Sequence, residues 1–248
     1  MNDAGFWRRW VAANSISETI GLGTTFIIGF GIISQVGDAS GTSAILLFAG
    51  IAVLLGMFEG AVVGVTQSLV IKRWLSDFKI RSWVIATIVG ALLAWMRGML
   101  PSTGMSLSAS EKSSAPSMDM PDWIGIVLAM PLGTVAGMVL ASAQWLALRR
   151  WVARAWLWLP ANALAWLVGM PIIFFGTSLI QPSTSALQAA VIMLIAIATT
   201  GAAVGAVHGS VLAHLLRRQP RDPLPQKLYV TVHHRPWFCC RCVPSFLR

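Results

Sequence analysis

The chain has 248 residues, of which 56% are hydrophobic and only 11% are charged. Soluble domains carry about a quarter charged residues, so a chain this apolar would expose patches that aggregate in water. A lipid bilayer is the solvent that this composition fits. The net charge of +9 would suggest nucleic acid in a soluble protein. Basic residues also gather at the cytoplasmic ends of membrane spans, and we expect no nucleic-acid partner.

Six apolar stretches are long enough to cross hydrocarbon, which takes about 20 residues of helix. They cover about 13–35, 44–71, 82–100, 123–148, 157–180 and 188–216. Backbone polar groups in lipid must pair within their own segment, so each stretch is expected to be a helix. No convincing signal-peptide cleavage site follows the first stretch, which we interpret as a retained span. The predicted fold is all-α: a polytopic membrane protein with six transmembrane helices.

The connections between these stretches alternate in charge. All but two of the 18 basic residues precede the first stretch, lie in the second and fourth connections, or follow the sixth stretch. Basic residues mark the cytoplasmic side, so we expect both termini in the cytoplasm and the chain in the plasma (inner) membrane. The segment from Pro101 to Pro121 is rich in Ser and Met and is predicted to be a flexible outer loop.

The even-numbered stretches share a ladder of small residues spaced four apart, and a basic pair follows each ladder. The ladders are Gly56, Gly60 and Gly64; Gly133, Gly137 and Ala141; and Gly201, Gly205 and Gly209. Small residues at this spacing let two helices approach closely in lipid. We therefore expect specific packing, with the even helices together in the centre of the bundle.

The odd-numbered stretches share a weaker pattern, a tryptophan followed four residues later by a short polar residue. The pairs are Trp10 and Asn14, Trp83 and Thr87, and Trp158 and Asn162. Together the two patterns predict three helical-hairpin repeats over about 10–73, 83–150 and 158–218. The membrane domain is then 1–216, and 217–248 is a basic, cysteine-containing cytoplasmic tail. This arrangement resembles poorly characterised bacterial multispan membrane proteins with glycine-ladder hairpins, a resemblance that implies no activity.

Four ionisable residues fall inside the predicted spans, where such groups are costly and are candidates for function. They are Glu18, Glu59, Arg97 and His208. The helical rise places Glu59 and Arg97 about 20 and 24 Å from the cytoplasmic edge, so we predict that they pair. Glu18 and His208 both lie about 14 Å deep and are expected to meet if the first and last spans are neighbours. A proton or ion relay is one interpretation, and interhelical clasps that fix register are the favoured one.

Other polar and aromatic residues are expected to have structural roles. Gln67, Gln144, Asn14 and Asn162 are interpreted as donors and acceptors of interhelical hydrogen bonds. Eight of the 12 tryptophans lie near predicted cytoplasmic interfaces, where an aromatic belt anchors membrane helices. These eight are Trp7, Trp10, Trp74, Trp83, Trp145, Trp151, Trp156 and Trp158.

The tail contains a group of soft metal ligands: His233, His234, Cys239, Cys240 and Cys242. Thiolates suit Cu(I) and zinc, but the cysteines lack the paired spacing of a zinc site. A basic, aromatic tail on the anionic inner leaflet, with acylated cysteine, fits better. We therefore expect no copper or zinc cofactor, whereas bound lipid or pigment is compatible with the sequence.

No catalytic motif supports an enzyme. Six spans with His208 in the last one invite comparison with rhomboid proteases, but Ser142 lacks the flanking glycines of their nucleophile motif, and a serine without base and oxyanion donors is inert. We therefore expect a structural or accessory subunit that packs in a larger membrane complex or homo-oligomer, surrounded by membrane lipids. The alternative is a transporter of a small solute, a proton or a metal ion.

Overall fold

The structure, a computed structural model, describes residues 3–36, 41–111 and 121–218. These residues form six α-helices and one short 3-10 helix, η1, and no strand lies among them. The elements are α1 (Asp3–Val36), α2 (Thr42–Lys72), α3 (Ile80–Glu111), α4 (Asp122–Leu148), η1 (Ala155–Leu157), α5 (Trp158–Ser178) and α6 (Ala186–Arg217). The all-α prediction is confirmed, and each predicted apolar stretch lies on one of the six α-helices.

The largest difference in helix length concerns the predicted outer loop. Helix α3 continues through Pro101 to Glu111, so the first half of that segment is helical and the loop prediction was wrong there. Proline removes one backbone hydrogen bond, but a membrane helix tolerates it because neighbouring groups satisfy the freed carbonyl. Pro131 and Pro171 likewise lie inside α4 and α5. Residues 112–120 and the tail from 219 onward, with its cysteines and histidines, lie outside the described residues.

Five helices in the described part of the chain are long and apolar enough to cross a membrane. They are α2, α3, α4, α5 together with η1, and α6. Large apolar side chains cover their outer surfaces, as with Leu47 and Leu54, which are 66% and 64% exposed. An outer surface of this kind fits a multi-pass helical membrane protein, because lipid and not water must solvate it.

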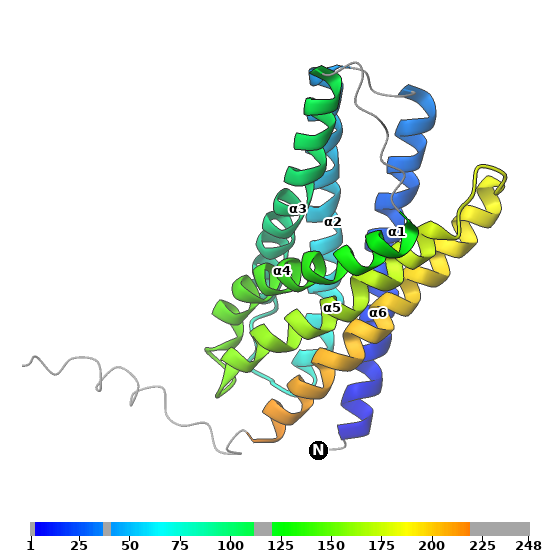
Figure 1. Ribbon diagram of the computed structural model, residues 1–248. Helices are drawn as coiled ribbons and strands as arrows, with labels where there is room; N and C mark the ends of the chain where they lie inside the picture. The colour runs from blue at the N-terminus through cyan, green and yellow to red at the C-terminus, as the bar shows by residue number, and fades with distance from the viewer. Residues whose placement is uncertain (1–2, 37–40, 112–120, 219–248) are drawn as a thin grey trace, which may run out of the picture.

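The six α-helices form a ring in which each helix packs against the helix before it and the helix after it. Helix α1 contacts both α2 and α6, and this contact closes the ring (Figure 1). The start of α1, the α2–α3 and α4–α5 connections and the end of α6 lie together at one end of the bundle, drawn at the bottom of Figure 1. We call this the basic end, because nearly all the basic residues of the described chain lie there.

The glycine ladders pack against neighbouring odd-numbered helices. A β-carbon at Gly64 would meet Thr87 of α3, one at Gly137 would meet Asn162 of α5, and one at Gly205 would meet Asn14 of α1. The expectation that even helices meet in the centre was therefore wrong, since each even helix presents its ladder to the next odd helix in the ring. The specific close packing that the ladders predicted is nevertheless present.

Close packing is concentrated in part of the bundle, although a β-carbon at Gly176 of α5 would lie 2.6 Å from Cβ of Ala196 of α6, farther from the basic end than the ladders. Gly23 and Gly29 of α1, Gly50 of α2 and Gly98 of α3 have no atom within 4 Å of an added β-carbon. Gly50 lies farther from the basic end than the ladder on its own helix. Gly23, Gly29 and Gly98 lie farther from it than the residues of α1 and α3 that the ladders contact. The helices also diverge toward that far end (Figure 1). The helices therefore converge on a tightly packed region next to the basic end.

Candidate functional site

Three tryptophans form the centre of the tightly packed region. Trp10, Trp83 and Trp158 are each 0% exposed, and the Trp158 ring lies 6.1 Å from that of Trp10 and 5.9 Å from that of Trp83 between centroids. The prediction that these three belong to an interfacial belt was wrong. They face the inside of the ring, where their area contributes to the core. Trp156, by contrast, is 58% exposed, as expected of an anchoring side chain.

Each of these indoles donates its N–H to a side chain on the preceding helix of the ring. The bonds run from Trp83 Nε1 to Gln67 Oε1 at 3.2 Å, from Trp158 Nε1 to Gln144 Oε1 at 2.9 Å, and from Trp10 Nε1 to His208 Nδ1 at 2.9 Å. Burying an indole N–H without a partner is costly. The acceptors therefore fix how α2, α4 and α6 pack against α3, α5 and α1.

The amides extend this network between further helices. Gln67 Nε2 donates to Asn14 Oδ1 at 2.8 Å. Gln144 Nε2 donates to Thr87 Oγ1 at 3.1 Å and to Gln67 Oε1 at 3.3 Å. The prediction of interhelical hydrogen bonds is confirmed for Gln67, Gln144 and Asn14. Asn162 instead donates to the Trp158 carbonyl of its own helix at 2.9 Å.

Two buried carboxyl groups lie beyond this network, away from the basic end. Glu18 of α1 is 2% exposed and Glu59 of α2 is 8% exposed. A β-carbon at Gly21, one turn past Glu18, would lie 2.9 Å from Cα and 3.2 Å from Cβ of Glu59. Helices α1 and α2 therefore approach closely at this level, and Glu18 lies one helical turn from this contact. We call these two residues the carboxyl pair.

The two members of the pair have different surroundings. Glu59 Oε2 accepts a 3.0 Å hydrogen bond from Trp95 Nε1 of α3. Glu18 Oε2 is fully buried and has no hydrogen-bond partner, and it is the one buried side-chain polar atom without a partner among the described residues. Gly201 of α6 leaves room for Glu18, because a β-carbon added at Gly201 would lie only 3.0 Å from Cβ of Glu18.

Both charge pairings predicted from helix depth were wrong. Arg97 is exposed and lies two residues beyond Trp95, hence on nearly the opposite side of α3 from the side chain that binds Glu59. Glu18 packs against Gly201, whereas His208 lies about two turns nearer the basic end. The His208 ring contacts Trp10 and Trp158 at centroid distances of 5.7 and 5.1 Å.

The sequence did contain a signal for the carboxyl pair. The estimated depths of Glu18 and Glu59 differ by about 6 Å, one helical turn, which two glutamate side chains can bridge on adjacent helices. Matching residues by equal depth and opposite charge missed this pairing of like groups. Two carboxyl groups in a low-dielectric interior cannot both ionise without a compensating cation or proton. The pair is therefore the candidate functional site.

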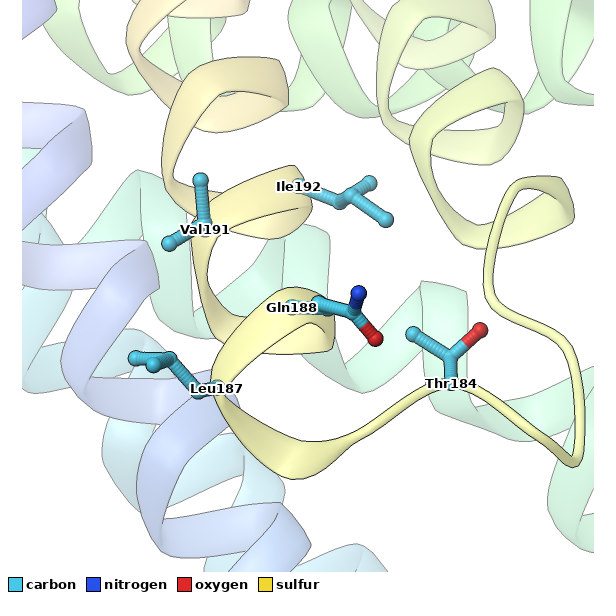
Figure 2. Close-up of a pocket in the computed structure, with 5 residues that line it drawn as sticks. All are labelled: Thr184, Leu187, Gln188, Val191 and Ile192. Atoms are coloured by element: carbon cyan, nitrogen blue, oxygen red, sulfur yellow. The ribbon is translucent and has the colours of Figure 1, made fainter.

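A second feature is an open hollow at the start of α6, which Figure 2 shows. It is lined by Thr184, Leu187, Gln188, Val191 and Ile192. None of these side chains is ionisable, and Gln188 forms a capping box with Ser185 at the helix start. The hollow therefore offers no chemistry of its own. No group of three or more metal-ligating side chains occurs among the described residues either.

Comparisons with family models, with curated proteins and with solved structures gave no match for this chain.

Proposed function

We propose that this chain is a membrane transporter of a small cation, the alternative that the sequence left open, and that the carboxyl pair of Glu18 and Glu59 is its binding site. The observation that carries the proposal is the buried, unpartnered Oε2 of Glu18, one helical turn from the close contact between Gly21 and Glu59. Ionisable residues within a membrane bundle mark ion pathways and proton relays. A group that served only to fix register would be expected to have its hydrogen bonds satisfied.

The position of the pair supports transport. The pair lies between the Trp10, Trp83 and Trp158 cluster on its basic side and a smaller buried apolar cluster on the other side, formed by Leu22, Ile173, Met193 and Ile197. An ion held there is separated from the basic end by three indole rings. Apolar clusters on both sides of the pair would occlude a bound ion, and alternating access then requires that one of them opens at a time.

The other function expected from the sequence, a structural or accessory subunit, has less support. Its support came from the glycine faces, from the scarcity of polar residues to line a pathway and from the lack of catalytic motifs. Gly60, Gly137 and Gly205 instead pack against helices of the same chain, so these faces are already occupied. Proton or cation binding accounts for the carboxyl pair, which an accessory role leaves unexplained.

The proposal includes a membrane topology. We propose that α1 is the sixth span, since its 34 residues reach about 51 Å and it lies beside α2 and α6. The charge bias then places the basic end, with both termini, in the cytoplasm. The equivalent Trp bonds to Gln67, Gln144 and His208 support three hairpin repeats. Reporters fused after residue 218 and inserted near residue 115 test this topology and should lie on opposite sides.

Ion flux into liposomes that contain the purified protein tests the transport proposal. Trapped indicator dyes would follow protons, Na⁺, K⁺, Zn²⁺ and Cu⁺ in separate experiments. We expect flux of at least one of these ions, and loss of that flux to the rate of protein-free liposomes in Glu18→Gln and Glu59→Gln. These substitutions keep the shape of the side chain and remove its charge and proton.

The matched control is Asp77→Asn, which removes an exposed carboxyl group in the α2–α3 connection and should keep the wild-type rate. Each variant must elute from size exclusion as the wild type does. The proposal would be overturned if the wild-type protein transported none of these ions. It would also be overturned if Glu18→Gln and Glu59→Gln each transported as fast as Asp77→Asn.

A further inference from the structure

We propose that the carboxyl pair binds a single proton, shared between Glu18 and Glu59, and that this proton is the ion the protein carries. This inference rests on the proposed transport function and names its substrate. It is carried by the arrangement of donors and acceptors around the two side chains.

The site has too few oxygen ligands for Ca²⁺ or Mg²⁺, and no group of three or more His, Cys, Asp or Glu side chains among the described residues offers a transition-metal site. Ca²⁺ takes six to eight oxygens and Mg²⁺ requires an octahedron. Near the pair, the Asn14 amide oxygen already accepts from Gln67, and the Thr25 hydroxyl donates to the Gly21 carbonyl at 3.1 Å. The remaining neighbours, Gly21 and Gly201, present backbone and no side chain. A proton needs no coordination shell.

The hydrogen bonds distinguish the two carboxyl groups. Glu59 Oε2 accepts from Trp95, and a donor of this kind stabilises the negative form of a carboxyl group. Glu18 Oε2 has no donor, so a negative charge there would be unsupported. A protonated Glu18 can use its O–H as a donor toward an oxygen of Glu59. One proton then lowers the charge of the pair from two negative charges to one.

Within the described ranges, no other charged group is placed to neutralise the pair. The residues that face it are Trp95 from α3 and Gly201 from α6. Arg97 is exposed on the far side of α3, and His208 accepts from Trp10 about two turns away. Charge balance in this region therefore depends on what binds between Glu18 and Glu59 themselves.

Release and uptake of the proton need no redox partner. The O–H bond of Glu18 breaks, the electron pair stays on its oxygen, and the proton passes to water on one side of the membrane. Uptake from the other side reverses the step. The doubly ionised pair that forms in between is unstable in lipid, so the empty site is expected to reload quickly.

Infrared spectroscopy of the purified protein in detergent at neutral pH tests this proposal, and it does not require an ion gradient or measurable transport. The wild type should show the C=O stretch of a protonated carboxylic acid, shifted in D₂O. Glu18→Gln should lose the band. Glu59 would then accept hydrogen bonds from the Trp95 indole and from the amide introduced at position 18, and these two donors would keep it ionised. Glu59→Gln should shift the band, because the acceptor changes. Asp77→Asn should leave it unchanged.

Glu18→Asp keeps an acid at this position and provides a second test in case Glu18→Gln does not fold. In Glu18→Asp the acid band should shift in frequency but remain present. A wild-type spectrum without the acid band, or a band that either glutamine variant leaves unchanged, would overturn the shared proton. If the wild-type protein transports a metal ion and shows no acid band, the transport proposal is supported and only the shared-proton proposal is refuted. The two proposals can therefore fail separately.

Discussion

The indole of Trp10 donates a 2.9 Å hydrogen bond to Nδ1 of His208, and this bond joins the first helix of the ring to the last. At the other two equivalent junctions the acceptor is a glutamine, Gln67 or Gln144. The position in α6 that matches these glutamines is Leu212, which is 0% exposed. His208 lies one turn earlier on the same face, so a different residue at a different position fills the same role.

His208→Leu should therefore destabilise the fold by about 1 to 3 kcal/mol, because it leaves a buried indole N–H without an acceptor. Thermal unfolding in detergent measures the change. His208→Leu combined with Leu212→Gln should recover part of the loss, since it recreates the junction seen at Gln67. The control is His214→Leu on the exposed side of α6. Equal effects of the His208 and His214 substitutions would contradict the role of this bond.

The glycine ladders give a second prediction. Gly137→Ala should lower stability by about 1 to 3 kcal/mol, the usual cost of overpacking, since its β-carbon would lie 2.6 Å from the backbone oxygen of Asn162. Gly98→Ala should be neutral or stabilising by up to about 1 kcal/mol through helix propensity, because nothing lies within 4 Å of it. Urea or heat denaturation of both variants checks the contrast, and a reversed order would be incompatible with this packing.

The Trp95 indole is expected to position Glu59. Trp95→Phe keeps an aromatic ring and removes the 3.0 Å donor, so it should slow ion flux by about tenfold or more, since a hydrogen bond to a charged group contributes roughly 1.5 to 3 kcal/mol. Trp123→Phe, at a position 63% exposed, is the control and should be silent. Unchanged flux and an unchanged infrared acid band in Trp95→Phe would show that Glu59 does not depend on this donor.

Oligomeric state separates the transporter from an accessory subunit. The ladders on α2, α4 and α6 are occupied within the chain, so the native protein in mild detergent should elute as a monomer or small homo-oligomer without pigment absorbance. Light scattering coupled to size exclusion measures the mass directly. A large heteromeric complex, or a bound chromophore, would instead favour the accessory role.

Much of the fold could be predicted from the sequence, because apolar length and charge bias act locally along the chain. The six apolar stretches and the close contacts of Gly60 or Gly205 follow from such local patterns. Partners inside the ring depend on which face of each helix turns inward, which depth alone does not give. For this reason Arg97 was placed opposite Glu59 and His208 opposite Glu18, and the buried position of Trp158 was missed. The neighbourhood of Glu18 and Glu59 required the structure.

The contact between α1 and α2 at the carboxyl pair can be tested directly by disulfide trapping. In a background with Cys239, Cys240 and Cys242 replaced by serine, Gly21→Cys is combined with Glu59→Cys, since a β-carbon at Gly21 lies 3.2 Å from Cβ of Glu59 and disulfides join β-carbons about 3.5 to 4.5 Å apart. The matched control is Gly23→Cys with Glu59→Cys, because Gly23 has no neighbour within 4 Å. The account predicts rapid oxidation of the first pair and little of the second. Folded protein that oxidises only the second pair, or neither, would contradict it.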